Sequence, residues 1–231
     1  MGNALSYVLD QNLATITIDD GKVNVMTAAL LAEFCDLVER ARDDKAMILL
    51  RSGRERVFSA GFDVKPLASG DREASRALLE AGVQAILSLL EHPFPVIGLC
   101  AGHAYPMGAF LLLASDLRIG VTGDYLVGMN EVAIGIPVPD FALRLAEYRL
   151  TPSHFHWSAA LGQMLSPEGA LDAGFFDLLV EPDGVDALLG QSIAQLGKID
   201  MAAHASTKSR MRAEVTQAIR TAARDRLMPT G

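Results

Sequence analysis

Cysteine is scarce in this 231-residue chain, and the two cysteines lie far apart. Cys35 falls in a predicted helix and Cys100 in a predicted strand, and neither belongs to a C-x-x-C pair. This spacing is typical of reduced thiols in the core of a cytosolic protein and argues against a disulfide framework. The first residues contain no basic region followed by an apolar run, so we expect no signal peptide and predict a cytoplasmic location.

Positive charge is also in short supply. The chain has 20 Lys and Arg against 28 Asp and Glu, which gives a formal net charge of −8 and a pI of about 5.1. An acidic balance argues against broad binding to nucleic acid or to an anionic membrane surface, although a local basic pocket for a phosphorylated ligand remains compatible with it. Neither a P-loop nor a G-x-G-x-x-G motif occurs, so the sequence does not support a nucleotide site of either kind.

One stretch lacks charged residues altogether. The segment from Pro93 to Ser115 contains no Asp, Glu, Lys or Arg, which superficially suggests a membrane span. It is interrupted by prolines and glycines and has His103 in its middle. A buried strand, a turn and the start of a buried helix explain it better, so we predict no membrane span.

The chain also lacks internal repeats, low-complexity segments and linkers rich in Gly, Ser or Pro. Half of its residues are hydrophobic, which suits one α/β domain with a substantial core. Strand patterns alternate with helix patterns to about residue 120, and the rest is mostly helical. The predicted strands are 6–9, 14–18, 46–51, 57–59, 96–100, 117–121, 125–128 and 178–180. The predicted helices are 27–42, 74–91, 109–115, 138–149, 153–161, 166–174, 185–196 and 202–226, with a loop over 68–72 and a turn over 102–108.

Six segments in order carry a family pattern. They are G-K-V-N-V-M at 21–26, V-F-S-A-G-F-D at 57–63, H-P-F-P-V-I-G-L-C-A-G at 92–102, L-L-A-S-D-L-R-I at 112–119, N-E-V-A-I-G-I at 130–136 and L-G-Q-M-L-S-P-E-G-A-L-D-A-G at 161–174. With these segments the chain resembles the enoyl-CoA hydratase/isomerase, or crotonase, superfamily over most of its length.

The resemblance implies an α/β fold. It would be a crotonase-like spiral of β-β-α turns over residues 1–195, followed by a helical segment, 196–231, in the same domain that makes subunit contacts. It also implies an acyl-CoA thioester substrate, with coenzyme A as part of the substrate and no separate cofactor, and a homotrimer or a hexamer made of two trimers.

The resemblance further implies a set of site residues. One backbone donor to a thioester oxyanion belongs to the position matching Ala60, and the other lies in the turn that here contains Pro106. Proline has no N–H, so Met107 is the first choice and Gly108 the second. Glu131 matches a family carboxylate; its apolar neighbours favour a general base with a raised pKa over a surface or helix-capping glutamate.

Coenzyme A has its own implied contacts. The family places the adenine near the loop that matches Ala60 to Asp63 and Lys65, and it pairs phosphates with basic side chains. Lys208 is a candidate for such a contact, and a solvated surface lysine is the alternative.

The sequence departs from the family in two places. Family hydratases have a second glutamate at the position occupied here by Phe110. Because moving a double bond needs one base, whereas adding water is served by two carboxylates, we prefer an isomerase that shifts a 3-enoyl-CoA to the 2-position. The family's usual last helix is also short or missing after Lys208 and Arg212.

Other functions stay open. An enoyl-CoA hydratase or another crotonase-type activity is the nearest alternative, and a non-catalytic acyl-CoA-binding or assembly protein is the alternative from a different class. His154 and His156 form an H-x-H pair without a third ligand nearby, so we predict no metal site. A hydrolase built on His103, Ser115 and Asp116 is disfavoured, because no G-x-S-x-G elbow occurs.

Overall fold

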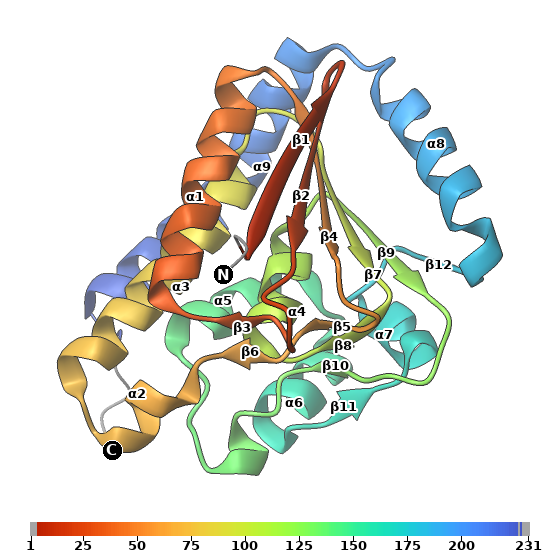
Figure 1. Ribbon diagram of the computed structural model, residues 1–231. Helices are drawn as coiled ribbons and strands as arrows, with labels where there is room; N and C mark the ends of the chain where they lie inside the picture. Colours follow the sequence, from red (N-terminus) through yellow and green to blue (C-terminus); the bar gives the residue numbers. More distant parts are fainter. Residues whose placement is uncertain (1–3, 226, 228–231) are drawn as a thin grey trace.

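The computed structural model describes residues 4–225 and 227 and has one six-stranded sheet (Figure 1). Its strand order is β1-β2-β4-β7-β9-β12. The β1–β2 hairpin is antiparallel, and every later pair in the sheet is parallel. The strands are β1 (Leu5–Asp10), β2 (Leu13–Ile18), β4 (Met47–Ser52), β7 (Val96–Cys100), β9 (Leu117–Val121) and β12 (Leu178–Val180).

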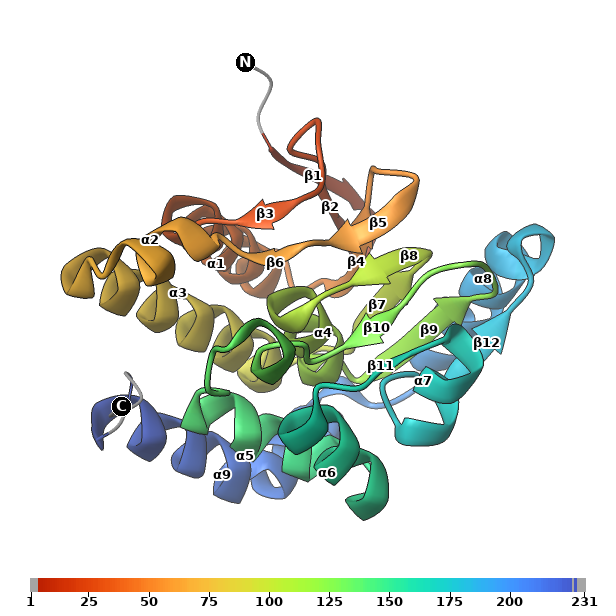
Figure 2. The same ribbon diagram turned by 90° about the horizontal axis from the view of Figure 1, so that it is seen from below.

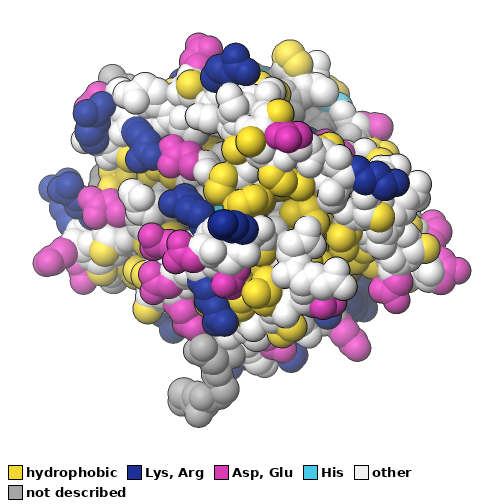
Figure 3. Space-filling model, turned by 90° about the horizontal axis from the view of Figure 1, so that it is seen from above, with side chains coloured by type: hydrophobic (Ala, Val, Ile, Leu, Met, Phe, Trp, Pro, Cys, Tyr) yellow, Lys and Arg dark blue, Asp and Glu magenta, His cyan; other side chains and the backbone are white. Residues whose placement is uncertain are grey.

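Helices cover both faces of this sheet. Side chains of a strand alternate between its two faces, so Ile48 and Leu50 join the main core under α1 (Ala28–Asp43) and α3 (Arg72–Glu91). Leu49 joins a smaller cluster under α8 (Val185–Leu196) on the other face. Buried on both faces, the central strands are nearly continuous apolar runs. Figure 3 shows hydrophobic side chains in the middle of the surface seen from above, with charged ones around them.

A second, four-stranded sheet, in the order β11-β10-β8-β5, lies below the first in the view of Figure 1. Its strands are β5 (Arg56–Ser59), β8 (Gly102–Ala104), β10 (Val127–Gly128) and β11 (Met164–Leu165). A two-stranded parallel pair, β3 (Val25–Met26) with β6 (Gly61–Phe62), continues beside it (Figure 2). Helix α4 (Pro106–Ala114) is buried along its whole length between these layers.

Local capping explains several element boundaries. Thr27 caps α1 by accepting from the Leu30 amide, and Ser166 caps α7 (Pro167–Ala173) by accepting from the Gly169 amide. Gly174 ends α7 in the left-handed conformation. The predicted positions of these caps are confirmed.

Two local predictions are wrong. The segment over 102–108 is not a single turn, because β8 forms first and α4 already begins at Pro106, which suits the first helical position. The stretch before α3 also contains a short helix, α2 (Val64–Ser69), which Asp63 caps by accepting from the Lys65 amide. Both elements are too short for hydrophobic periodicity to reveal.

The C-terminal region is helical and folds back on the chain's own core. After α5 (Asp140–Arg149), α6 (Pro152–Leu161) and α8, the long helix α9 (Met201–Asp225) packs against α3 and α5. Val215 and Ile219 of α9 are members of the main core. A last helix is therefore present at the expected place, although the prediction of its end at residue 226 lies outside the described residues.

Candidate active site

Three parallel strands of the smaller sheet deliver three chain segments to one edge. β5 pairs with β8, and β8 pairs with β10, in each case in parallel. The segments that follow them begin at Ala60, Tyr105 and Met129, respectively. Because the carboxyl ends of neighbouring parallel strands meet at the same edge, the stretches predicted to carry the chemistry start side by side (Figure 2).

Glu131 lies just after β10 and is buried, with 7% of its surface exposed. Among residues 4–225 and 227 it is the only Asp or Glu in the buried class. Its Oε2 atom is fully enclosed and has no hydrogen-bond partner among the described residues. Burial raises the pKa of this carboxyl to about 7, with a smaller opposing effect from a hydrogen bond to its own backbone amide. A carboxyl with this pKa can accept and return a proton near neutral pH.

The alternative interpretations of Glu131 are wrong. It precedes the 3-10 turn η1 (Val132–Ile134), but its side chain makes no capping hydrogen bond there. Nor is it a surface residue. A buried carboxyl without a partner costs stability, and strained electrostatics of this kind are typical of functional sites.

The first turn of α4 supplies backbone donors. Tyr105 precedes the helix without a side-chain cap, and Pro106 has no N–H. The Ala109 amide already donates to the Tyr105 carbonyl, so the orphan amides of this helix start belong to Met107 and Gly108. A Cβ atom at Gly108 would lie 2.8 Å from Cβ of Ser59, which explains why only glycine fits there.

The predicted donor at Ala60 is contradicted by the structure. The Ala60 amide donates to the Val23 carbonyl over 2.9 Å, so this N–H is already used to hold the chain. The sequence pattern could not reveal this bond, because it depends on how β3 and β6 pair.

The Phe62 amide is a candidate donor that the sequence pattern missed. The Asp63 amide donates to the Met26 carbonyl at 3.0 Å, and Met26 is the register partner of Phe62. Successive amides of an extended strand point in opposite directions, so the Phe62 N–H points away from β3. The start of α4 lies beside β6, where a Cβ at Gly61 would be 3.5 Å from the backbone nitrogen of Pro106.

A buried hydrogen-bond network fixes the segment that follows β5. Asn24, fully buried, donates through its amide group to the carbonyls of Ile18 and Phe58, at 3.0 Å each. Ser59 donates to the Asn24 carbonyl at 2.7 Å and accepts from the Gly61 amide at 3.0 Å. The Ser59 carbonyl accepts from the Tyr105 amide at 2.9 Å. These bonds tie the segments after β5 and β8 together.

An apolar side chain occupies the position where the resemblance implies a second glutamate for hydratases. Phe110 is fully buried on α4, and so is Met107 one turn before it. No carboxylate from α4 therefore accompanies Glu131, because this helix contains no Asp or Glu.

The predicted coenzyme A contacts differ in their surroundings. Lys65 on α2 is exposed, and Asp63 is half-buried at the start of that helix. Lys208 is buried instead: its ammonium group donates to Asp116 at 2.5 Å and to the Phe94 carbonyl at 3.2 Å. The solvated-lysine interpretation of Lys208 is wrong, and its engaged ammonium group also contradicts a role in binding phosphate.

The residues of the competing hydrolase do not form a triad. His103 accepts from the Leu126 amide through Nδ1, Ser115 donates to the Leu111 carbonyl, and Asp116 pairs with Lys208 and Arg212. Within the part of the chain that the structure describes, no group of three His, Cys, Asp or Glu side chains could hold a metal ion. No helix of that part is long and apolar enough to cross a membrane.

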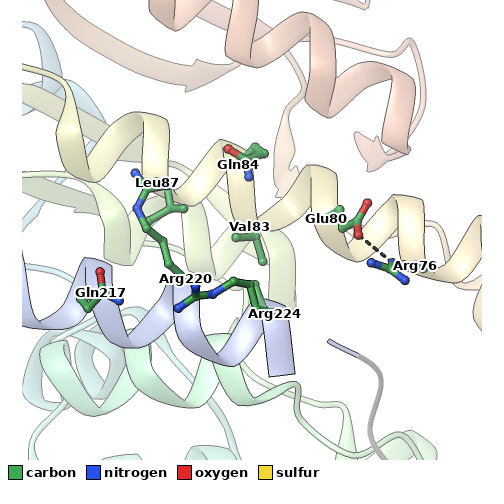
Figure 4. Close-up of a pocket in the computed structure, with 9 residues that line it drawn as sticks. Arg76, Glu80, Val83, Gln84, Leu87, Gln217, Arg220 and Arg224 are labelled. Carbon is green, nitrogen blue, oxygen red and sulfur yellow. Dashed lines mark hydrogen bonds and ion pairs between the residues drawn. The ribbon is translucent and has the colours of Figure 1, made fainter. Parts of the chain in front are cut away.

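Grooves also run along α9. One of about 520 Å³ lies between α3 and α9, where Figure 4 shows Arg76, Arg220 and Arg224. Arg76 pairs with Glu80 at 2.8 Å and Arg220 with Glu91 at 2.6 Å. These ion pairs are exposed, and no buried titratable group among the described residues lines the groove. Glu131 is therefore the better candidate for the chemistry.

Known proteins share this architecture. Residues 9–228 match the sequence model of a family described as enoyl-CoA hydratase/isomerase. A Pseudomonas syringae structure described as an enoyl-CoA hydratase/isomerase family protein superposes with a TM-score of 0.93 and 36% identity, covering 97% of this chain and 96% of that one.

The names of other relatives are divided. A Mycobacterium tuberculosis structure described as an enoyl-CoA isomerase has a TM-score of 0.90 and 34% identity, with 97% of both chains covered. A probable enoyl-CoA hydratase of Bacillus subtilis is 31% identical over 180 residues, which are 76% of this chain and 69% of the relative. With its spiral α/β fold and helical C-terminal region, the chain belongs to the enoyl-CoA hydratase/isomerase family.

Proposed function

We propose that this member of the family is an isomerase that moves the double bond of a 3-enoyl-CoA to the 2-position. The observation that carries the proposal is that Glu131 is a single buried carboxyl with a pKa of about 7, whereas Phe110 occupies the place of a second one. One base is enough for a double-bond shift, because the proton that it removes can be returned to the same substrate.

The proposed reaction has two proton transfers. Glu131, ionised, removes a proton from C2 of the acyl chain, and the electron pair moves through the thioester carbonyl to give a dienolate. The protonated Glu131 then gives the proton to C4, the C2–C3 double bond forms, and the carboxylate is regenerated. No atom is gained or lost, so neither water nor a redox cofactor is needed.

The dienolate oxygen needs preorganised donors. The proposed donors are the amides of Phe62 and Met107, with Gly108 second, because the Phe62 N–H points away from β3 and the first amides of α4 have no partner within their own helix. Backbone donors held by neighbouring structure stabilise such an oxyanion without reorganising, typically by about 3 kcal/mol each. The N-terminal end of α4 adds positive potential at the same place.

Substrate binding is proposed around β6 and the start of α2. Asp63 and Lys65 there, together with the half-buried Ala60 just before β6, are the proposed contacts for coenzyme A. Lys65 is an exposed cation near the site edge, which suits a phosphate.

A hydratase is the second candidate, because many relatives carry that name, as in Bacillus subtilis. A non-catalytic binding protein is the third, since the bulky Met107 in the place of a smaller residue would narrow the pocket. The test is to incubate the purified protein with 3-enoyl-CoA and, separately, 2-enoyl-CoA, and to identify products by mass. Conversion of 3- to 2-enoyl-CoA without gain of water supports the isomerase; a gain of 18 Da from 2-enoyl-CoA indicates the hydratase; binding without turnover indicates the third candidate.

We further propose a homotrimer or a dimer of trimers in the cytoplasm. Apolar surface supports association: Trp157, Leu161 and Met211 are 43%, 63% and 66% exposed. Cys35 and Cys100 are both free thiols, which suits a reducing compartment. Light scattering at working concentration tests the assembly, and a monomer there would refute it.

A further inference from the structure

Gly82 lies in the interior of α3, where glycine is less favourable than alanine. Close packing accounts for it. A Cβ atom at this position would lie 2.6 Å from Cζ and 2.8 Å from Cε1 of Phe62, both far inside van der Waals contact. The same Cβ would be 3.5 Å from Sδ of Met107. The bare backbone of Gly82 thus forms a notch that receives the Phe62 ring next to the Met107 side chain.

The two side chains at this notch belong to the two residues whose amides are the proposed oxyanion donors. β6 contributes only Gly61 and Phe62, so a displaced Phe62 ring has little strand on which to spread the movement. Met107 is fully buried and cannot move into solvent to make room. Interiors are close-packed, so an added methyl group must displace one of these side chains.

We propose that Gly82 is a positioning residue for the oxyanion hole: its notch in α3 seats the Phe62 ring and thereby holds the Phe62 amide in register with the Met107 amide. This inference rests on the proposed function of those two amides. Gly82 itself touches no reacting atom, because its nearest contacts are to side-chain atoms of Phe62 and Met107.

The test substitutes Gly82→Ala in the full-length protein. We expect kcat with 3-enoyl-CoA to fall by about 10- to 100-fold, because small displacements of preorganised donors are costly, while KM changes by less than about 3-fold. The matched control is Gly190→Ala in α8, which makes the same change in a helix interior where no atom lies within 4 Å of the added Cβ. This control should keep wild-type kinetics.

A second pair of variants isolates the contact. Leucine at position 62 lacks the Cε1 and Cζ atoms that meet the notch. In a Phe62→Leu background, Gly82→Ala should therefore change kcat by less than about 2-fold relative to Phe62→Leu alone. If Gly82→Ala does not fold, Phe62→Tyr tests the same contact from the other side, because its hydroxyl is attached at Cζ and extends into the notch; kcat should again fall.

A spectroscopic measurement separates this inference from the proposed reaction. The thioester carbonyl stretch of bound butyryl-CoA, which has no double bond to move, should shift to lower frequency in the wild type, and the shift should be smaller in Gly82→Ala. Equal kcat and equal carbonyl frequency in the wild type and Gly82→Ala would overturn the proposal, as would an undiminished effect in the Phe62→Leu background. If the wild type turns over neither enoyl-CoA, the proposed function fails, yet the carbonyl frequencies still decide the role of Gly82.

Discussion

The Lys208 ammonium group and the Asp116 carboxylate form an interior ion pair, with Nζ and Oδ2 2.5 Å apart. Arg212 holds the other oxygen of Asp116 at 2.7 Å, and the Val96 amide donates to Asp116 at 2.8 Å. The pairs join α9 to Asp116, which lies between the end of α4 and the start of β9. The Val96 amide links the same carboxylate to the start of β7. Burial lowers the pKa of Lys208 to about 8, with the neighbouring Asp116 opposing that shift. The pair therefore fastens the C-terminal helix to the core that carries the site.

Lys208→Met should lower the free energy of unfolding by about 3 kcal/mol, because removing one partner leaves the partly buried Asp116 carboxylate with less compensation. Lys65→Met, on exposed α2, is the matched control and should change it by less than about 0.5 kcal/mol. Urea denaturation at neutral pH measures both. A Lys208→Met protein as stable as the wild type would show that the pair contributes nothing.

Glu131→Gln should reduce isomerisation of 3-enoyl-CoA by at least about 10³-fold, because the amide cannot accept the C2 proton. Binding of a saturated acyl-CoA should stay within about 3-fold, since the side chain keeps its shape and the backbone donors are unchanged. Quenched time-course assays measure the isomerisation rate, and calorimetry measures the affinity for the saturated acyl-CoA. Wild-type turnover in this variant would remove Glu131 from its assigned role.

The pH dependence of kcat/KM follows from the same carboxyl. Only its ionised form acts as the base, and its pKa is raised to about 7. Activity should thus increase with pH, reach half of its plateau near pH 7 and level off near about pH 8, with about one tenth of the plateau left at pH 6. A profile already flat between pH 5.5 and 8 contradicts either the assignment or the raised pKa.

The unfavourable burial of Glu131 also predicts a stability effect. The folded protein keeps the proton up to about pH 7, whereas the unfolded chain loses it near the ordinary value of 4.5, so wild-type stability decreases as pH rises through this interval. Glu131→Gln avoids that loss and should be more stable by up to about 3 kcal/mol at pH 8, with little difference at pH 4. The exposed Glu39→Gln is the control for denaturation at both pH values. An equal change at pH 4 and pH 8 would contradict the linkage.

The burial of His92 predicts that stability decreases as the pH becomes acidic. Its ring is buried and its Nε2 lies 2.9 Å from the Ala46 carbonyl, and burial lowers its pKa to about 4. The unfolded chain takes up this proton near pH 6.5, so wild-type stability falls as pH drops from 6.5 toward 4. His92→Gln should flatten this fall by up to about 3 kcal/mol at pH 4, whereas the exposed His156→Gln should not. Thermal unfolding measures the stability of both proteins at each pH. An equal loss of stability between pH 6.5 and pH 4 in His92→Gln and in the wild type would rule this out.

Local sequence patterns predicted much of the architecture. Alternating or continuous apolar runs located the strands of the large sheet, and capping residues such as Thr27 and Ser166 located helix starts, because these signals act between residues a few positions apart. The resemblance added the family, and with it the expectation that Glu131 is a base. Its burial was inferred from apolar neighbours in the sequence, and the structure agrees.

What the sequence determined by itself was the order of the longer helices and strands, the resemblance to the family, and a lone carboxylate among apolar residues. Only the tertiary structure decided which amides are free. The Val23 carbonyl occupies the Ala60 amide, and pairing of β3 with β6 turns the Phe62 amide outward. The packing of α9 buries Lys208 against Asp116. The fit of Phe62 into Gly82 was likewise beyond the sequence. These facts depend on contacts between residues distant along the chain, and short-range patterns carry no information about the register or depth of such contacts.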